Sequence, residues 1–303
     1  MLTKLAPAFD PSANSVGVWP GEDGRLLVWG FTPLTGFSVS VRTVGAGQVL
    51  VSFEYGTEGF KAIITGTKTE FVNKSALLDL VTPAPGQLKG EGLAAVLGDL
   101  PAKMGRIYDY QLIAKSMRAH GHGGTLLIVN EESNWGDSIH QPMVVTGRPY
   151  EKVKQDLEHR GMTLESERET NPIMAFFSDR YQTAREVADR SLDVIGRLTA
   201  IDGATLVTDD LNVLAFGIKI KAKNSDEKPG TLRVSEPFEG SVSEDLDVSS
   251  LGGTRHQSAA QFVFDQRDAV AVVASQDGRL SIFRWDSAEG KVSVIRPAEF
   301  MLL

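Results

Sequence analysis

The chain has 303 residues, of which 42% are hydrophobic and 23% charged, and its net charge at pH 7 is −8. This composition is typical of one large or two ordinary folded domains, and it excludes a largely disordered chain. The acidic charge and the lack of a basic cluster argue against binding to duplex DNA through its phosphates. Because the sequence has no cysteine, disulfides, thiolate metal sites and a cysteine nucleophile are excluded.

Neither a membrane protein nor a secreted protein is expected. The longest apolar runs, such as residues 125–129, are too short to cross a bilayer. The opening segment MLTKLAPAFDPSANS has one lysine and no apolar core, so it does not resemble a secretory signal. Together with the absence of cysteine, these features predict a cytoplasmic protein without a membrane partner.

The N-terminal part of the chain predicts a small antiparallel sheet. Between residues 15 and 72, runs of β-branched and aromatic residues are separated by breaks that contain glycine. The predicted strands are residues 26–31, 37–42, 48–53 and 60–64. We interpret residues 1–80 as a small β-rich domain, and residues 81–105 as a linker and connecting helix. The linker begins with two prolines and a glycine in residues 81–87.

From residue 106 to residue 303, segments with helical and strand patterns alternate. The predicted helices are residues 110–117, 150–160 and 183–198. The predicted strands are residues 123–129, 205–208, 213–220, 269–275, 280–284 and 291–295, the last two forming a hairpin. This alternation predicts an α/β domain with a mixed central sheet flanked by helices. Residues 226–250 contain seven acidic and two basic residues with few large apolar ones, which predicts a mobile loop.

The first candidate site segment is Ile-Asp-Gly-Ala-Thr-Leu-Val at residues 201–207, where the longest predicted helix gives way to a strand. Asp202 places a carboxylate at the start of the strand, where it could hold a divalent cation or accept a hydroxyl proton. Gly203 allows a ligand or another stretch of backbone to approach closely. Taken alone, the pair is better explained as an ordinary turn, because Asp-Gly is common in turns.

The second segment is Gly-Gly-Thr-Arg-His-Gln-Ser-Ala-Ala at residues 252–260, which predicts a helix with Thr254 as its N-cap. Arg255 and His256 then lie in the first turn, where backbone N–H groups and the helix dipole favour an anion. Cations at this end do not stabilise the helix itself, so they suggest a phosphate between them. In the alternative, Thr254 and Gln257 form a capping box, and Arg255 and His256 point into solvent. The spacing does not decide between the two.

Together the two segments resemble the paired motifs of diadenylate cyclase domains: Asp-Gly-Ala at the start of a strand, then Gly-Thr-Arg-His-x-x-Ala some fifty residues later. Residues 112–129 look like the opening helix and strand of that family. Residues 268–281 look like its Asp-Ala…Ser-Glu-Glu-Thr-Gly segment. The resemblance covers roughly residues 108–285, and the N-terminal part of the chain has no counterpart.

The resemblance implies a domain that binds ATP and faces a second subunit. In that family each ribose 3′-hydroxyl attacks the α-phosphate held by the other subunit, and cyclic di-AMP is formed. By the same resemblance, Asp202 would lie near a metal and the attacking hydroxyl. The residues implied to line the nucleotide and its phosphates are Gly203, Ala204, Gly253, Thr254, Arg255, His256 and Gln257.

Three departures from the family pattern weaken the case for catalysis. Gln257 replaces a second arginine, residues 274–276 lack the expected carboxylates, and residues 216–221 replace a Leu-Pro-Leu-Ser/Thr stretch. A missing phosphate cation and a missing metal ligand harm a phosphoryl-transfer transition state more than they harm binding. In an active enzyme, Asp277 or Glu236 would have to supply the second carboxylate.

We therefore expect a sensor that binds ATP or a cyclic dinucleotide, requires no cofactor, and passes its state to an effector protein, to the N-terminal domain or within a homodimer. The alternative is an active cyclase in which Asp202 helps to hold Mg²⁺ or Mn²⁺. A third possibility is a scaffold with a vestigial site. His120 and His122 form a weaker candidate metal site, since they have neither a carboxylate nor a third histidine beside them.

Overall fold

The protein divides into two compact units, seen in a computed structural model that describes residues 14–21, 25–33, 39–45, 47–55, 58–73, 100–130, 132–140, 142–144, 151–171, 174–175 and 178–302. The first unit comprises residues 1–74, 237–241 and 303, and the second comprises residues 75–236 and 242–302. The predicted linker at residues 81–87 lies outside the described residues.

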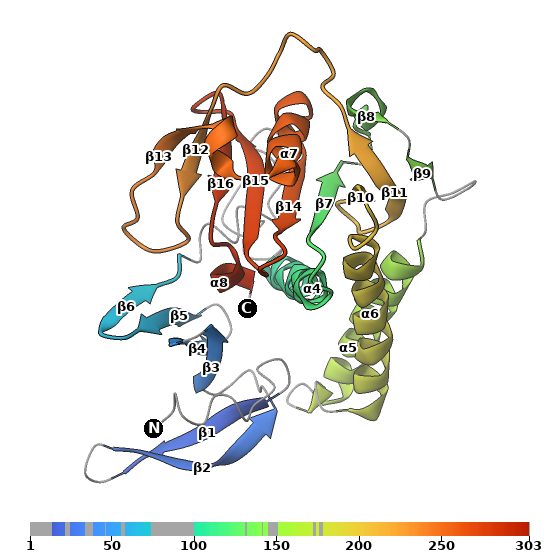
Figure 1. Ribbon diagram of the computed structural model, residues 1–303. Coiled ribbons are helices and arrows are strands. Elements are labelled where there is room, and N and C mark those ends of the chain that lie inside the picture. The colour runs from blue at the N-terminus through green and yellow to red at the C-terminus, as the bar shows by residue number, and fades with distance from the viewer. Residues whose placement is uncertain are drawn as a thin grey trace. The chain divides into compact units, whose positions relative to one another are not determined.

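The first unit holds two antiparallel sheets among its described residues, where the sequence predicted one (Figure 1). The smaller sheet pairs β1 (Asn14–Pro20) with β2 (Leu26–Pro33). The larger sheet has the order β3-β4-β5-β6 and consists of β3 (Val39–Gly45), β4 (Gln48–Tyr55), β5 (Glu58–Thr65) and β6 (Lys68–Phe71). Leu50 on β4 and Ile63 on β5 are opposite one another and buried, which explains why the alternating pattern found these strands. Residues 237–241 belong to this unit, because Phe238 forms a β-bridge with Val72.

The second unit is built on one large mixed sheet with the strand order β13-β12-β16-β15-β14-β7-β10-β11-β8, and β9 also pairs with β11. Two neighbouring pairs, β7 with β10 and β12 with β16, are parallel, and the other pairs are antiparallel. The strands are β7 (Gly124–Val129), β8 (Ile139–His140), β9 (Met143–Val144), β10 (Ala204–Thr208), β11 (Val213–Ile220), β12 (Thr231–Ser235), β13 (Glu244–Asp247), β14 (Val270–Ala274), β15 (Leu280–Asp286) and β16 (Lys291–Ile295). The predicted mixed sheet flanked by helices is thus confirmed.

Alternating side chains on the central strands build a core on each face of this sheet. On β7, Leu127 and Val129 pack on the same side as α7 (Thr254–Asp265), whose buried residues include Phe262. Leu126 and Ile128 pack on the other side, against α4 (Leu100–Ala119) and α6 (Asp179–Leu198). The unit therefore has three layers, and Figure 1 shows α7 lying along β14 and β15.

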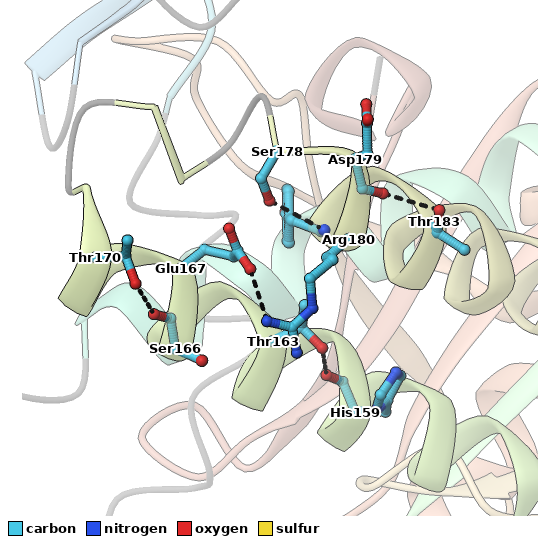
Figure 2. Close-up of polar contacts among 10 residues, drawn as sticks. His159, Thr163, Ser166, Glu167, Thr170, Ser178, Asp179, Arg180 and Thr183 are labelled. Atoms are coloured by element: carbon cyan, nitrogen blue, oxygen red, sulfur yellow. Dashed lines mark hydrogen bonds and ion pairs between the residues drawn. The ribbon is translucent and has the colours of Figure 1, made fainter.

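Two long helices, α5 (Lys152–Thr170) and α6, pack side by side. The helix α5 extends ten residues beyond the predicted end at residue 160. In this extension Glu167 forms a 3.1 Å ion pair with Arg180 of α6 (Figure 2). Nearer the start of α5, Asp156 accepts a hydrogen bond from Ser191 of α6. A short α8 (Glu299–Leu302) completes the helices of the described residues. None of the helices in the described ranges is long and apolar enough to span a membrane.

The prediction of a mobile loop at residues 226–250 is wrong. These residues include β12, β13 and a 3₁₀ turn, η4 (Val248–Leu251). On β12, Leu232 and Val234 are buried, while the charged residues of the segment lie outside and form ion pairs such as Arg233 with Glu289 at 3.1 Å. A short strand with one apolar face and one charged face has too few apolar residues to stand out in a compositional scan.

Candidate functional site

Several neighbouring strands of the large sheet begin or end along the same border, which we call the sheet edge. The strand β7 begins at Gly124, which lies opposite Ala274 at the end of β14. The parallel neighbour β10 begins one residue further along, with Ala204 opposite Thr125. This register brings the Asp202 segment, the glycine-rich turn at residues 121–124 and the end of β14 to the same edge. The start of α7 also reaches this edge, because Arg255 in its first turn lies beside Gly123 of the glycine-rich turn.

Arg255 lies against the glycine-rich turn. Gly123 has a φ of +69°, and a Cβ built on it would lie 3.2 Å from Arg255 Nη1 and 3.1 Å from the carbonyl oxygen of Ala274. The guanidinium thus occupies the space that a side chain at position 123 would need. Arg255 is partly buried, and within the described part of the chain its guanidinium makes no hydrogen bond or ion pair. A guanidinium with five donors in this position is ready to bind an anion.

The start of α7 differs from the sequence prediction. Gly253, not Thr254, is the N-cap, and the helix therefore begins without a side-chain cap. The backbone N–H groups of His256 and Gln257 both donate to the carbonyl of Gly253, at 3.0 and 3.4 Å. The Gln257 side chain donates to the carbonyl oxygen of Gly252 at 3.2 Å, so the alternative capping box with Thr254 does not form. The first N–H groups of the helix are left without an intrahelical acceptor, as at the start of any helix.

His256 and an unpredicted arginine lie beside this helix start. The Nε2 atom of His256 lies 3.3 Å from Ser281 Oγ, and its ring meets Phe283 edge-on at 6.1 Å between centroids. Burial lowers the pKa of His256, Arg296 lowers it further, and Asp277 opposes the shift. His256 is therefore neutral at pH 7. Arg296 donates a 3.0 Å hydrogen bond to the carbonyl oxygen of Leu251, directly before the two glycines that open α7.

Arg296 is the site residue that the sequence did not reveal. It lies some forty residues beyond the Gly-Gly-Thr-Arg-His segment and belongs to no recognisable motif. Its place follows from the sheet, since Arg296 comes directly after β16 and its backbone N–H donates to Ser235 at the end of the parallel neighbour β12. Only the pairing of β12 with β16 could have located it.

His120 is fixed in a neutral form at the same edge. The backbone N–H of His122 donates to His120 Nδ1 at 3.2 Å, so Nδ1 carries no proton. Nε2 therefore carries the proton and donates to Thr199 Oγ1 at 3.1 Å. Burial lowers the pKa of His120, and His122 and Arg255 lower it further. Because both ring nitrogens are engaged, His120 is not available to a metal in this arrangement.

The Asp202 segment is mostly structural in this arrangement. Gly203 has a φ of +107°, and a Cβ on it would lie 2.7 Å from the backbone of Gly217 and Ile218. The close approach that this glycine permits is thus to another strand. Ala204 is buried in the core on the α7 side of the sheet. Asp202 itself is exposed, and none of the hydrogen bonds or ion pairs described for the chain engages it.

Carboxylates are sparse where a catalytic metal would be needed. Among the described residues, no three His, Asp or Glu side chains come together as a possible metal site. Asp277 is close enough to His256 to affect its pKa, but its carboxylate lies 3.4 Å from Arg279 and also accepts the Arg279 backbone N–H. Three basic side chains and open helix N–H groups thus favour holding an anion over activating a nucleophile.

A hollow at the far end of α7 is a weaker candidate for a binding site. Its lining residues are Lys223, Asn224, Glu227, Phe264, Asp265 and Arg267. The polar groups there already bond to one another: the Lys223 backbone N–H and the Gln261 side chain both donate to Asp265, and Asn224 donates to Glu227. The Arg267 guanidinium lies over the ring of Trp285, 4.3 Å from its centroid, and Lys223 Nζ lies 3.8 Å from Asp137, so most polar groups of this hollow are engaged within the protein.

Comparisons with known proteins do not assign the chain to a family: no protein-family model matches the sequence, and no curated protein matches it. Inference about function therefore rests on the residues and their arrangement.

Proposed function

We propose that the second unit binds a nucleotide, either ATP or a cyclic dinucleotide, and acts as a sensor without turnover. The observation that carries the proposal is Arg255, whose guanidinium lies against Gly123 at the start of α7 without a partner among the described residues. The motif order and the mixed sheet support a domain of diadenylate cyclase type as the framework of this site.

The chemistry of the site suits a phosphate. A charge-assisted hydrogen bond contributes about 1.5–3 kcal/mol, and the start of a helix contributes roughly 0.3–1 kcal/mol more to holding an anion. Arg296 adds a second cation close to His256. A bound phosphate would also favour protonation of His256, which would add a third positive charge when the ligand arrives. Phosphodiesters and polyphosphates both fit this description.

The absence of turnover is proposed from the side chains that a cyclase would need. Gln257 stands where the family has an arginine, and its amide braces the Gly252 carbonyl. The nearest acidic side chain to His256 that the structure identifies is Asp277, and it is engaged with Arg279. Asp202 is exposed, and among the described residues no group of three His, Asp or Glu side chains comes together as a possible metal site.

The decisive experiment removes the Arg255 side chain. We expect Arg255→Ala to weaken binding of ATP or cyclic di-AMP by about 1.5–3 kcal/mol, because one charge-assisted hydrogen bond is lost. Calorimetric titration of the full chain with each ligand measures this change. The matched control is Arg180→Ala on α6, which removes the same charge from an exposed ion pair with Glu167. It should leave affinity unchanged.

Incubation with labelled ATP and Mn²⁺ separates the sensor from the alternatives. Retained ligand without product supports the sensor. Cyclic di-AMP in the product would establish the cyclase instead. If the wild-type protein binds neither ligand, or if Arg255→Ala binds as tightly as the wild type, the phosphate site is disproved.

A further inference from the structure

The helix α6 carries an apolar strip on the side that faces away from the core. Its buried residues are Ala184, Ala188, Leu192, Ile195 and Gly196. By contrast, Val187 and Val194 are 37% and 42% exposed. They are seven residues apart and therefore lie two turns apart on one side of the helix. Isolated exposed valines are unremarkable, but two on one strip of a long helix provide a surface on which another helix can pack.

Charges of alternating sign run along the same side. Their order is Glu186, Arg190, Asp193 and Arg197; the Asp193 side chain is 41% exposed and also accepts a hydrogen bond from Ser116 of α4, whereas the other three side chains are 68–79% exposed. Within the helix they form two ion pairs, Glu186 with Arg190 at 3.4 Å and Asp193 with Arg197 at 2.6 Å. Alternating signs are common on solvated helices. The spacing of these four residues (four, three and four positions apart) is also symmetric, so an antiparallel copy can place every charge opposite a charge of the other sign.

We propose that this surface of α6 is an interface between two copies of the chain, with the two α6 helices antiparallel about a two-fold axis. An antiparallel copy centred between residues 191 and 192 places Glu186 opposite Arg197, and Arg190 opposite Asp193. In the same register Val187 lies two residues from Val194 of the second copy, about 3 Å along the axis at 1.5 Å per residue. An isologous interface requires such self-complementarity.

Two parallel α6 helices in register would not fit, because each charged residue would then face the same residue, and so the same charge, in the second copy. If the partner were an unrelated protein, its charges could complement those of α6 in any order. The charge pattern of α6 would then have no reason to be complementary to itself. Exposed ion pairs contribute more to the choice of partner and orientation than to affinity. The interface is therefore expected to be weak, with its apolar contact supplied by the valines. The proposal does not depend on nucleotide binding, because none of these residues belongs to the proposed site.

The first test measures self-association of the full chain by sedimentation velocity over a range of protein concentrations. We expect the wild type to show a reversible monomer–dimer equilibrium. Val194→Asp should raise the dissociation constant by about tenfold or more, because it places an unpaired charge in the interface. The control Met162→Asp changes an apolar residue on α5 that is even more exposed (62% against 42% for Val194) and should leave the equilibrium unchanged.

The second test reverses charges and distinguishes contacts between copies from contacts within one helix. Arg197→Glu alone places two glutamates opposite each other and should weaken the dimer. Adding Glu186→Arg restores opposite signs across the interface and should restore the dimer. Within one helix the double change leaves like charges at both i, i+4 pairs, so a purely intrahelical effect would make the double variant worse than the single one.

The proposal is overturned if the wild type remains monomeric at all concentrations, or if Val194→Asp dimerises as the wild type does. It is also overturned if the double charge reversal fails to recover association while circular dichroism shows an intact fold.

Discussion

Gly123 and Gly203, at the same edge of the large sheet, are both crowded, but by different kinds of neighbour. Gly123 and Gly203 both have positive φ, and a Cβ on either would be crowded. At Gly203 the crowding comes from the backbone of the neighbouring strand β11, which cannot move without breaking the hairpin. At Gly123 part of the crowding comes from the end of a flexible side chain, Arg255.

Gly203 belongs to the Asp-Gly-Ala motif, whereas Gly123 lies against Arg255 of the Gly-Gly-Thr-Arg-His motif. The difference indicates that the two motifs have different roles. The Asp-Gly-Ala segment closes a strand pair, and its glycine is required by the fold. The Gly-Gly-Thr-Arg-His segment leaves a cation and helix N–H groups at the sheet edge, where a ligand can reach them. Substitutions of Gly203 should therefore reduce stability, and substitutions of Arg255 should reduce binding.

The largest effect expected from this comparison is that of Gly203→Ala. The added Cβ would meet backbone atoms at 2.7 Å in a conformation that L-residues rarely adopt. We expect a loss of about 3–5 kcal/mol in the free energy of unfolding, measured by urea denaturation. Gly161→Ala is the control, because nothing lies within 4 Å of its Cβ on α5, and it should stabilise the helix by about 0.5–1 kcal/mol. A neutral Gly203→Ala would contradict the structural role of the first motif.

An intermediate effect is expected from Asp202→Asn. Since Asp202 is exposed, the free energy of unfolding should hardly change. In a sensor the carboxylate can bond a ribose hydroxyl or a weakly held cation, so affinity should fall by no more than about tenfold, or 1.4 kcal/mol. Titrations with and without Mg²⁺ measure this, and any response to the cation should disappear in the variant. Loss of cyclic di-AMP formation in Asp202→Asn would instead identify a catalytic residue.

The smallest effect concerns the titration of His120, and it tests whether Arg255 lies beside the glycine-rich turn. The pKa of His120 is lowered first by burial and then by His122 and Arg255. In Arg255→Ala its pKa should therefore move up toward the ordinary value near 6.5. Ring-proton NMR shifts across pH 5–8 measure the change. An unchanged titration curve would place Arg255 away from the turn.

The same lowered pKa fixes the sign of a pH dependence. Below about pH 6.5 the unfolded chain protonates its histidines, while folded His120 stays neutral. The stability that this group contributes is thus full above pH 6.5 and is lost as the pH falls through the lower folded pKa. His256 acts in the same direction. Replacing His120 with Gln should flatten the dependence of unfolding free energy on pH.

The sequence predicted the core of the fold well wherever strands were apolar. The predicted ends of β11 and β16 agree with the structure, because Asn212 and Lys221 flank β11, Gly290 and Arg296 flank β16, and both strands carry buried apolar side chains. The strands β12 and β13 were missed, since their stability comes from pairing with each other and with β16 and not from local composition. The end of α5 was missed because its residues beyond position 160 are mostly polar or charged, and the contact described there is the ion pair of Glu167 with Arg180 on α6.

The candidate site was predictable only in part. Arg255 and His256 could be proposed from the sequence because they lie together in one short segment, and local chemistry at a helix start can be inferred from sequence. Thr254 was the wrong choice of N-cap, because either Gly253 or Thr254 can open such a helix and only the backbone decides. Arg296 reaches the site through the pairing of strands far apart in the chain, which a single sequence does not reveal.

The position of β7 in the sheet has a consequence for the order in which the protein can assemble. This strand is made early, but its two neighbours are β10, at residues 204–208, and β14, at residues 270–274. During synthesis β7 must therefore wait for most of the chain before both of its edges are covered. Long-range pairing of this kind slows folding and leaves a strand edge open to association with other chains. A nascent chain stalled before β14 would expose the apolar centre of the sheet, which is where a chaperone would be expected to bind.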